Sequence, residues 1–104
     1  MHEIIDPIAV RELEARTAAG EVRPVLVRFG RPEPDPLPGG DWQCAFQVTG
    51  IGDDGVEHAF GVDAVQALQL AFVAVGARLH AAGSRLGITW LGMSDLGFPL
   101  PPER

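Results

Sequence analysis

The clearest hydrophobic pattern in the chain is the strict alternation of residues 42–49, WQCAFQVT. Every second residue of this segment is apolar and would point to the same side of a strand: Trp42, Cys44, Phe46 and Val48. A turn-forming run, GIGDDG, follows it. The next segment, 56–62, alternates again and places on one face Val56, His58, Phe60 and Val62. Together the two segments predict a half-buried β-hairpin.

Two segments before this hairpin complete the predicted sheet. In residues 22–30 the alternation of Val25, Val27 and Phe29 predicts a strand, and its proline places it at a sheet edge or a strand end. Residues 8–17 are ambiguous. An Asp-Pro pair before them and a glycine after them are helix signals, whereas their apolar residues follow no helical stripe. These residues alone leave strand and helix open.

The strongest helix signal covers residues 63–82. Asp63 is a typical N-cap, Gln66 completes a capping-box arrangement, and Gly83 follows the expected end. Residues at three- and four-residue steps are predicted to face the sheet, with Phe72 at the centre of this stripe: Val65, Leu68, Phe72, Val75, Leu79 and Ala82.

The opposite side of the predicted helix is apolar as well. It carries a second strip, interrupted by Gln66 and His80, which consists of Leu70, Val73, Ala74, Ala77 and Ala81. Because a four-stranded sheet covers only one side of a single helix, we expect another element to cover this strip. Either the C-terminal tail, through its large side chains, or a second subunit would do so. The candidate interaction surface is therefore Leu70, Val73, Ala77, Trp90 and Phe98.

These elements predict an α+β fold. We expect an antiparallel meander sheet of about four strands with one long helix packed on one face. Residues 1–104 would form a single domain, because a chain of this length supports one core. Residues 31–40 carry alternate prolines and are expected to form a stiff connector. Residues 88–104 are expected to form an extended tail.

The charge and composition narrow the range of partners. The net charge is −6, which opposes binding to nucleic acid, and the absence of Lys excludes lysine-based catalysis. A single cysteine excludes an intrachain disulfide. The N-terminus carries Glu3 and Asp6 where a signal peptide would be basic, and the longest fully apolar stretch, 70–77, is far shorter than a membrane span. We therefore expect a soluble, cytoplasmic protein without a membrane partner.

No catalytic constellation stands out in the sequence. The glycines of GIGDDG satisfy GxGxxG, but no helix signal begins after them, and Asp53 and Asp54 would repel a pyrophosphate. These two acids are better read as turn residues than as an acid/base pair. Ser94 lies in GMSDLG, which is not a nucleophile elbow. We expect no enzyme activity and no cofactor.

A metal site is equally unsupported, because no His, Cys or acid has a ligand spacing such as CxxC or HExxH. Cys44 and His58 should both face inward from neighbouring strands. A turn centred on residues 53 and 54 would pair His58 near Thr49 or Gly50, which leaves Cys44 some five residues, or roughly 17 Å, away. We therefore predict a buried, inert thiol at Cys44 and a hydrogen-bonded core histidine at His58.

The C-terminal sequence PLPPER contains a short recognition pattern. Pro99 and Pro102 have PxxP spacing with Arg104 two residues beyond, as in ligands of aromatic-lined grooves. Because proline-rich domain ends are common, we favour an ordinary chain end here.

Three segments resemble a family of small bacterial proteins catalogued as a domain of unknown function: GDWQCAF at 40–46, AFGVDAVQALQLA at 59–71 and TWLGMSDLGFP at 89–99. The resemblance covers nearly the whole chain from about residue 8. It implies that residues 8–17 form a strand, which makes the order β-β-β-β-α followed by the tail. It implies no activity, cofactor or catalytic residue.

The leading functional hypothesis is a non-catalytic protein-interaction or assembly module, motivated by the second apolar strip. Its partner would be a second copy or another protein. One alternative is an acidic, immunity-like protein that binds a basic toxin, motivated by the net charge. The other alternative is a small-ligand-binding protein.

Overall fold

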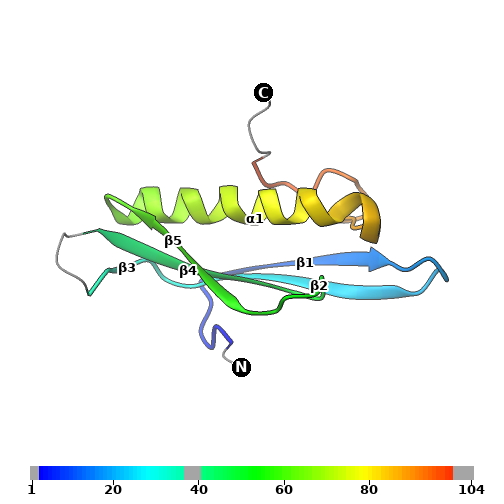
Figure 1. Ribbon diagram of the computed structural model, residues 1–104, viewed down its shortest axis with the longest axis horizontal. Helices are drawn as coiled ribbons and strands as arrows, with labels where there is room; N and C mark the ends of the chain where they lie inside the picture. Colours follow the sequence, from blue (N-terminus) through cyan, green and yellow to red (C-terminus); the bar gives the residue numbers. More distant parts are fainter. Residues whose placement is uncertain (1–2, 37–40, 100–104) are drawn as a thin grey trace.

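A computed structural model of the chain describes residues 3–36 and 41–99. The elements follow in the order β1 (Ala9–Arg16), β2 (Val22–Phe29), β3 (Glu33–Pro34), β4 (Trp42–Thr49), β5 (Val56–Gly61) and α1 (Ala64–Leu86). The strands form one antiparallel sheet, and α1 lies along one face of it (Figure 1). The predicted α+β fold is confirmed.

Apart from the short β3, the sheet is a meander in which strands that follow one another along the chain pair with one another. β1 pairs with β2, β2 pairs with β4, and β5 pairs with the other edge of β4. The short β3 lies within the proline-rich connector and continues the β2 edge, where Glu33 opposes Gln43 and Pro34 opposes Trp42. Residues 37–40 of the connector lie outside the described residues.

The ambiguous first segment is a strand. All eight residues of β1 pair with β2, from Ala9 opposite Phe29 to Arg16 opposite Val22. Leu13 and Ala15 are buried against the helix side of the sheet. The local helix signals are overridden because strand pairing satisfies the backbone of this segment and buries its alternating apolar residues.

The helix begins as predicted and ends later than predicted. The Asp63 carboxylate accepts the backbone N–H of Gln66 at 2.8 Å, and the Gln66 side chain accepts the N–H of Val62. Gly83 does not end the helix. The chain turns at Gly87, whose φ of 58° is left-handed and whose N–H bonds the carbonyl of Gly83. Gly87 ends α1 because it adopts the left-handed conformation of a helix C-cap, whereas Gly83 keeps the helical conformation inside α1.

The sheet-facing stripe of α1 is rotated from the predicted one. Its fully buried residues are Ala67, Ala71, Val75, Leu79 and Ala82. Val65 is 62% exposed, so its predicted burial is wrong. Phe72 is half-buried at one flank of the stripe rather than central, with its ring 4.7 Å from that of Phe29. Small residues occupy many of the inward positions, where they let the helix lie close to the sheet.

The predicted register of the β4–β5 hairpin is also wrong. Its connecting turn spans residues 50–55, and pairing starts at Gln47 opposite Val56. His58 therefore opposes Ala45 and is exposed on the face of the sheet away from α1. Cys44 opposes Ala59 on the helix face. The expectation that His58 is a core histidine fails because the turn is longer than a tight hairpin turn.

The face away from α1 is partly covered by the N-terminal segment, which lies below the sheet in Figure 1. The backbone N–H of Ile4 donates to the side-chain oxygen of Gln47, which is fully buried. The side-chain nitrogen of Gln47 donates to the carbonyl of Asp54 at 2.8 Å. This buried amide ties the N-terminal segment to the β4–β5 turn.

Candidate interaction surface

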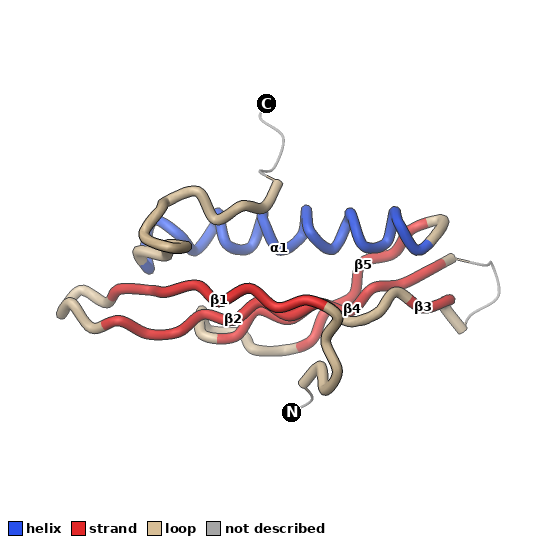
Figure 2. Tube along the Cα trace, turned by 180° about the vertical axis from the view of Figure 1, so that it is seen from behind, coloured by secondary structure: helices blue, strands red, loops and turns tan. Residues whose placement is uncertain are grey.

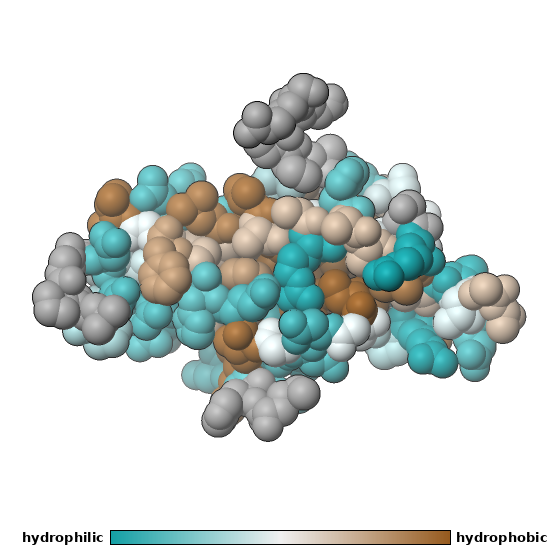
Figure 3. Space-filling model, in the orientation of Figure 1, coloured by the Kyte–Doolittle hydropathy of each residue, from teal (hydrophilic) through white to brown (hydrophobic). Residues whose placement is uncertain are grey.

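An apolar strip of α1 faces away from the sheet. We call it the outer strip, and it consists of Leu70, Val73, Ala74, Ala77 and Ala81. Leu70 is 41% and Val73 36% exposed, and Ala81 is exposed as well. Ala77 and Ala74 are half-buried, and Ala74 packs against the core at the edge of the strip. Apolar side chains gather along the helix layer in Figure 3. The second apolar side predicted for the helix therefore exists and remains accessible.

The C-terminal tail, residues 87–99, does not cover the outer strip. It runs along the opposite flank of α1 (Figure 2). A Cβ on Gly76 would collide with the carbonyl oxygen of Pro99, so this glycine is what lets the tail lie against the helix. The Phe98 ring packs 6.3 Å from Phe72 and 6.0 Å from Phe29. The prediction that the tail covers the outer strip is wrong, because the tail is anchored on the other flank of α1.

The anchor of the tail is Arg11 of β1. Its guanidinium carbon lies 3.9 Å from the centre of the Trp90 ring and 4.9 Å from that of Phe98. Its Nη1 donates to the carbonyl oxygens of Leu96 at 3.1 Å and Gly97 at 3.3 Å. The five residues of the predicted surface thus fall into two groups. Leu70, Val73 and Ala77 belong to the outer strip, whereas Trp90 and Phe98 pack on the β1 side.

Sequence reasoning missed Arg11, although the sequence contains a signal for it. Arg11 shares a strand face with Leu13, so it is a charged residue at a position that should face the helix. A cation at such a position needs a partner, and the aromatic tail supplies one.

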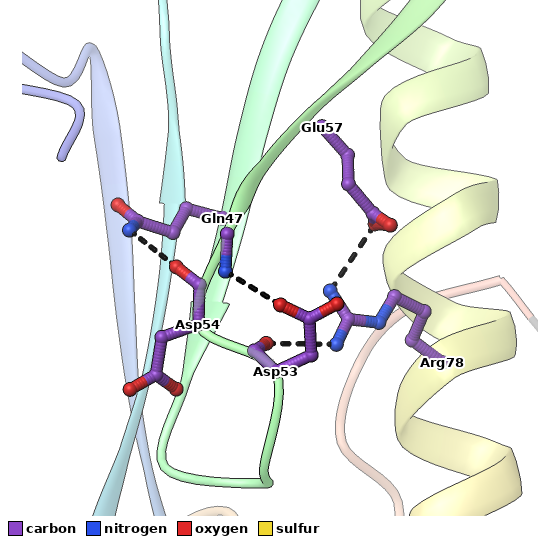
Figure 4. Close-up of polar contacts among 6 residues, drawn as sticks. Gln47, Asp53, Asp54, Glu57 and Arg78 are labelled. Atoms are coloured by element: carbon purple, nitrogen blue, oxygen red, sulfur yellow. Dashed lines mark hydrogen bonds and ion pairs between the residues drawn. The ribbon is translucent and has the colours of Figure 1, made fainter. Parts of the chain in front are cut away.

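The outer strip carries no ionisable charge. The charged residues of α1 are Arg78 and Arg85, and the first turn contains no acid. Arg78 bends toward β5 and is neutralised there, since its Nη1 lies 3.1 Å from a carboxylate oxygen of Glu57. Its Nη2 donates to the carbonyl of Asp53 (Figure 4). The result is an apolar surface bordered by a compensated ion pair.

The β4–β5 turn next to this ion pair is structural. The Asp53 carboxylate accepts the N–H of Gly55 at 2.9 Å, and the Asp54 carboxylate accepts the N–H of Gly50 at 3.0 Å. β5 follows the glycines directly, where a dinucleotide site would have a helix. The reading of both acids as turn residues is confirmed.

A cavity of about 680 Å³ lies between α1 and the tail. Its floor is apolar and includes Leu79, Ile88 and Leu96, and its polar lining residues are His80, Ser94 and Asp95. Among the described residues no hydrogen bond joins these three side chains. The Asp95 carboxylate instead accepts the N–H of Gly97 at 2.9 Å. The cavity therefore has the shape of a binding site but not the linked geometry of a catalytic triad.

Cys44 is buried, as predicted. Its Sγ lies 3.5 Å from the carbonyl oxygen of Gly30, and burial raises the pKa of the thiol. Within residues 3–36 and 41–99, no group of three or more His, Cys, Asp or Glu side chains is placed to hold a metal ion. Cys44 and His58 lie on opposite faces of the sheet, which excludes a shared site.

Comparison with known proteins places the chain in a family. Residues 9–100, from the first residue of β1 to the tail, match the family model described as Domain of unknown function (DUF6968). The chain belongs to this family. The matched residues of DUF6968 include β5, α1 and the tail as far as Pro99. The outer strip and the cavity therefore both lie within the family domain. Searches of curated proteins and of solved structures found no match.

By length and composition α1 could also cross a membrane over Ala64–Gly83. Core helices of globular proteins pass the same test, and the inward side of α1 closes the core against the sheet. Only 28% of this stretch is buried, so much of its apolar surface is exposed.

Proposed function

We propose that this protein is a non-catalytic assembly module that pairs with a second copy of itself through the outer strip. The observation that carries the proposal is that the outer strip is accessible and uncharged although the tail could have covered it. Contiguous apolar patches on proteins mark interaction sites, and small residues allow two helices to approach closely.

The net charge of the chain restricts where two copies can meet. Two molecules with a net charge of −6 repel each other over most of their surfaces. The outer strip is a place where contact brings no like charges together, because its neighbour Arg78 is already paired with Glu57. Burial of uncharged apolar surface then supplies the attraction.

Introducing a negative charge at Leu70 tests the proposal. Leu70→Glu places a carboxylate in the proposed contact and should weaken self-association by at least about 100-fold, because burying an unpaired charge costs several kcal/mol. The matched control is Gln69→Glu, which adds the same charge at an exposed position beside the outer strip. Sedimentation equilibrium measures both.

The expected result is a dimer for the unmodified chain and for Gln69→Glu, and a monomer for Leu70→Glu. A monomeric unmodified chain, or equal association of the two variants, would contradict the proposal. Circular dichroism and urea unfolding of each variant show that the comparison concerns folded protein.

The cavity beside the tail supports a second candidate function, the binding of a small apolar molecule. Its volume of about 680 Å³ is in the range of ligand pockets. Gly83 lines it, and a Cβ at Gly83 would meet no atom within 4 Å. Gly83→Phe should therefore place a ring in the cavity and obstruct it, whereas Gly83→Ala should leave it open. Binding of the neutral fluorophore N-phenyl-1-naphthylamine should be lost in the first variant and kept in the second, and equal binding by both would contradict this function.

A further inference from the structure

The two edges of the sheet differ in how they are protected. The outward edge of β1 is covered by the start of the tail: Glu14 and Thr89 exchange backbone hydrogen bonds of 2.9 and 2.8 Å, and Arg16 donates to Gly87. The outward edge of β5 has no strand partner among the described residues. Its sequence, VEHAFG, contains no proline and no lysine, and its one acid, Glu57, is paired with Arg78 of α1, so it has no unpaired acid or lysine of the kind that usually protects an exposed edge.

The unprotected edge lies on the same side of the molecule as the outer strip. β5 lies close to α1 over most of the length of the strand, since Gly61 lies against Ala67 and Glu57 pairs with Arg78. The middle of β5 therefore lies beneath the part of α1 around Ala74. The tail occupies the other flank, so a hydrogen-bonding strand edge and an uncharged helix face are presented together.

We propose that β5 pairs antiparallel with β5 of a second copy, so that one continuous sheet runs through the dimer with both α1 helices side by side on one face. This inference rests on the proposed function and adds the element that joins the two copies. A free strand edge is complementary to the same edge of an identical chain, because each supplies the donors and acceptors that the other lacks.

The spacing of the elements agrees with this arrangement. α1 contacts both β4 and β5, and an axis midway between these two strands would lie half a strand spacing inside β5. With strands about 4.8 Å apart, the two α1 axes would be about 10 Å apart, at the upper end of the 8–10 Å range of packed helices. The contact point at Ala74 is a small residue, which suits such an approach.

The area of the proposed contact is near the lower end for known dimers. A 23-residue helix is about 34 Å long, a six-residue strand is about 20 Å long, and each layer is about 10 Å thick, which gives roughly 540 Å² per copy. The smallest specific interfaces bury about 600 Å² per partner. The outer strip alone would provide about 340 Å² of this, so the strand edge is needed to approach that size.

The side chains of β5 select a register. A two-fold axis perpendicular to the sheet keeps every side chain on its own face, so residues pair only with residues of the same face. With the axis at His58, Phe60 lies opposite Val56 of the second copy. Phe60 is 51% exposed in the single chain, and an aromatic residue opposite a β-branched one stabilises antiparallel pairs. An axis at Ala59 would place Phe60 opposite His58 instead.

Site-specific cross-linking tests the arrangement in a Cys44→Ala background. In the proposed register His58→Cys faces itself across the axis at a separation that a disulfide spans, whereas Phe60→Cys is about 13 Å from its copy. Mild oxidation should therefore cross-link His58→Cys at least about tenfold faster than Phe60→Cys, which is on the same strand and face. Adding Leu70→Glu should abolish the cross-link.

The outcomes separate this inference from the proposed function. A dimer that Leu70→Glu dissociates, but in which His58→Cys does not cross-link or Phe60→Cys cross-links as fast, overturns the β5 pairing and leaves assembly through the outer strip intact. A monomer in sedimentation together with no cross-link at His58 overturns both. Rapid cross-linking of His58→Cys that Leu70→Glu abolishes supports both.

Discussion

Arg11 is the residue that connects the two ends of the domain. It lies on β1, and its partners Trp90, Leu96, Gly97 and Phe98 belong to the tail. The flat guanidinium group can stack on the aromatic rings and donate in its own plane to carbonyls at the same time, which lysine cannot do. Its contribution depends on residues about 80 positions away in the sequence.

Replacing Arg11 should release the tail. Arg11→Met keeps an apolar stem but removes the cation and the donors, so we expect a loss of about 1–3 kcal/mol in the free energy of unfolding. Urea unfolding measures it. The control is Arg23→Met, whose exposed ion pair with Glu21 at 3.6 Å should contribute less than about 1 kcal/mol. Equal losses in the two variants would show that Arg11 does not anchor the tail.

Cys44 should behave as an inert thiol. Burial raises the pKa of its thiol, so the reactive thiolate is scarce at neutral pH and access is blocked. A thiol reagent should label the native chain much more slowly than the urea-unfolded chain. Because the pKa is raised in the folded state, stability from the neutral thiol is present below the ordinary thiol pKa and is lost as the pH rises through the folded-state value. Native labelling at the unfolded rate would disprove the prediction.

At the scale of elements, α1 shows how one helix serves two environments. Its glycines differ in what surrounds them: Gly76 faces the carbonyl of Pro99, whereas the space beside Gly83 is open. Glycine inside a helix is less stable than alanine, so each position loses helix stability. At Gly76 that loss permits the tail to pack, and at Gly83 nothing in the described residues compensates for it.

The two alanine variants should therefore have opposite effects. Gly83→Ala should raise the free energy of unfolding by about 0.5–1 kcal/mol. Gly76→Ala gains the same propensity, but its Cβ collides with Pro99 and displaces the tail, so we expect a net loss of about 1 kcal/mol or more. Urea midpoints of the two proteins decide the matter. Stabilisation by both substitutions would mean that the tail does not press against Gly76.

At the scale of the whole molecule, net charge opposes the assembly that the apolar surface favours. Each copy carries a charge of −6, and few of these charges lie on the outer strip or on β5. Association therefore works against repulsion between charges spread over the remaining surface.

Added salt should strengthen the proposed dimer. Raising ionic strength from about 0.01 M to about 1 M shortens the screening length from roughly 30 Å to 3 Å, which removes most of the repulsion between copies. Sedimentation equilibrium across this range should show a lower dissociation constant at high salt. Weaker association at high salt would mean that attractive charge pairs, rather than apolar contact, hold the copies together.

Much of the fold follows from local pattern. The alternation in residues 42–49 predicted β4 to the residue, and the Asp63 and Gln66 pair predicted where α1 begins. Both succeed because a strand or a helix start depends on neighbours within a few positions. The second apolar side of α1 was equally visible, since helical periodicity alone sorts residues into faces.

The tertiary structure decided what covers each face. The six-residue turn placed His58 on the outside, the pairing with β2 made residues 9–16 a strand, and the Arg11 anchor drew the tail to the β1 flank. None of these follows from a local pattern, because each depends on which distant partner satisfies a backbone or a charge. The sequence by itself determined that α1 has two apolar sides, and only long-range contacts decided that the outer strip stays free.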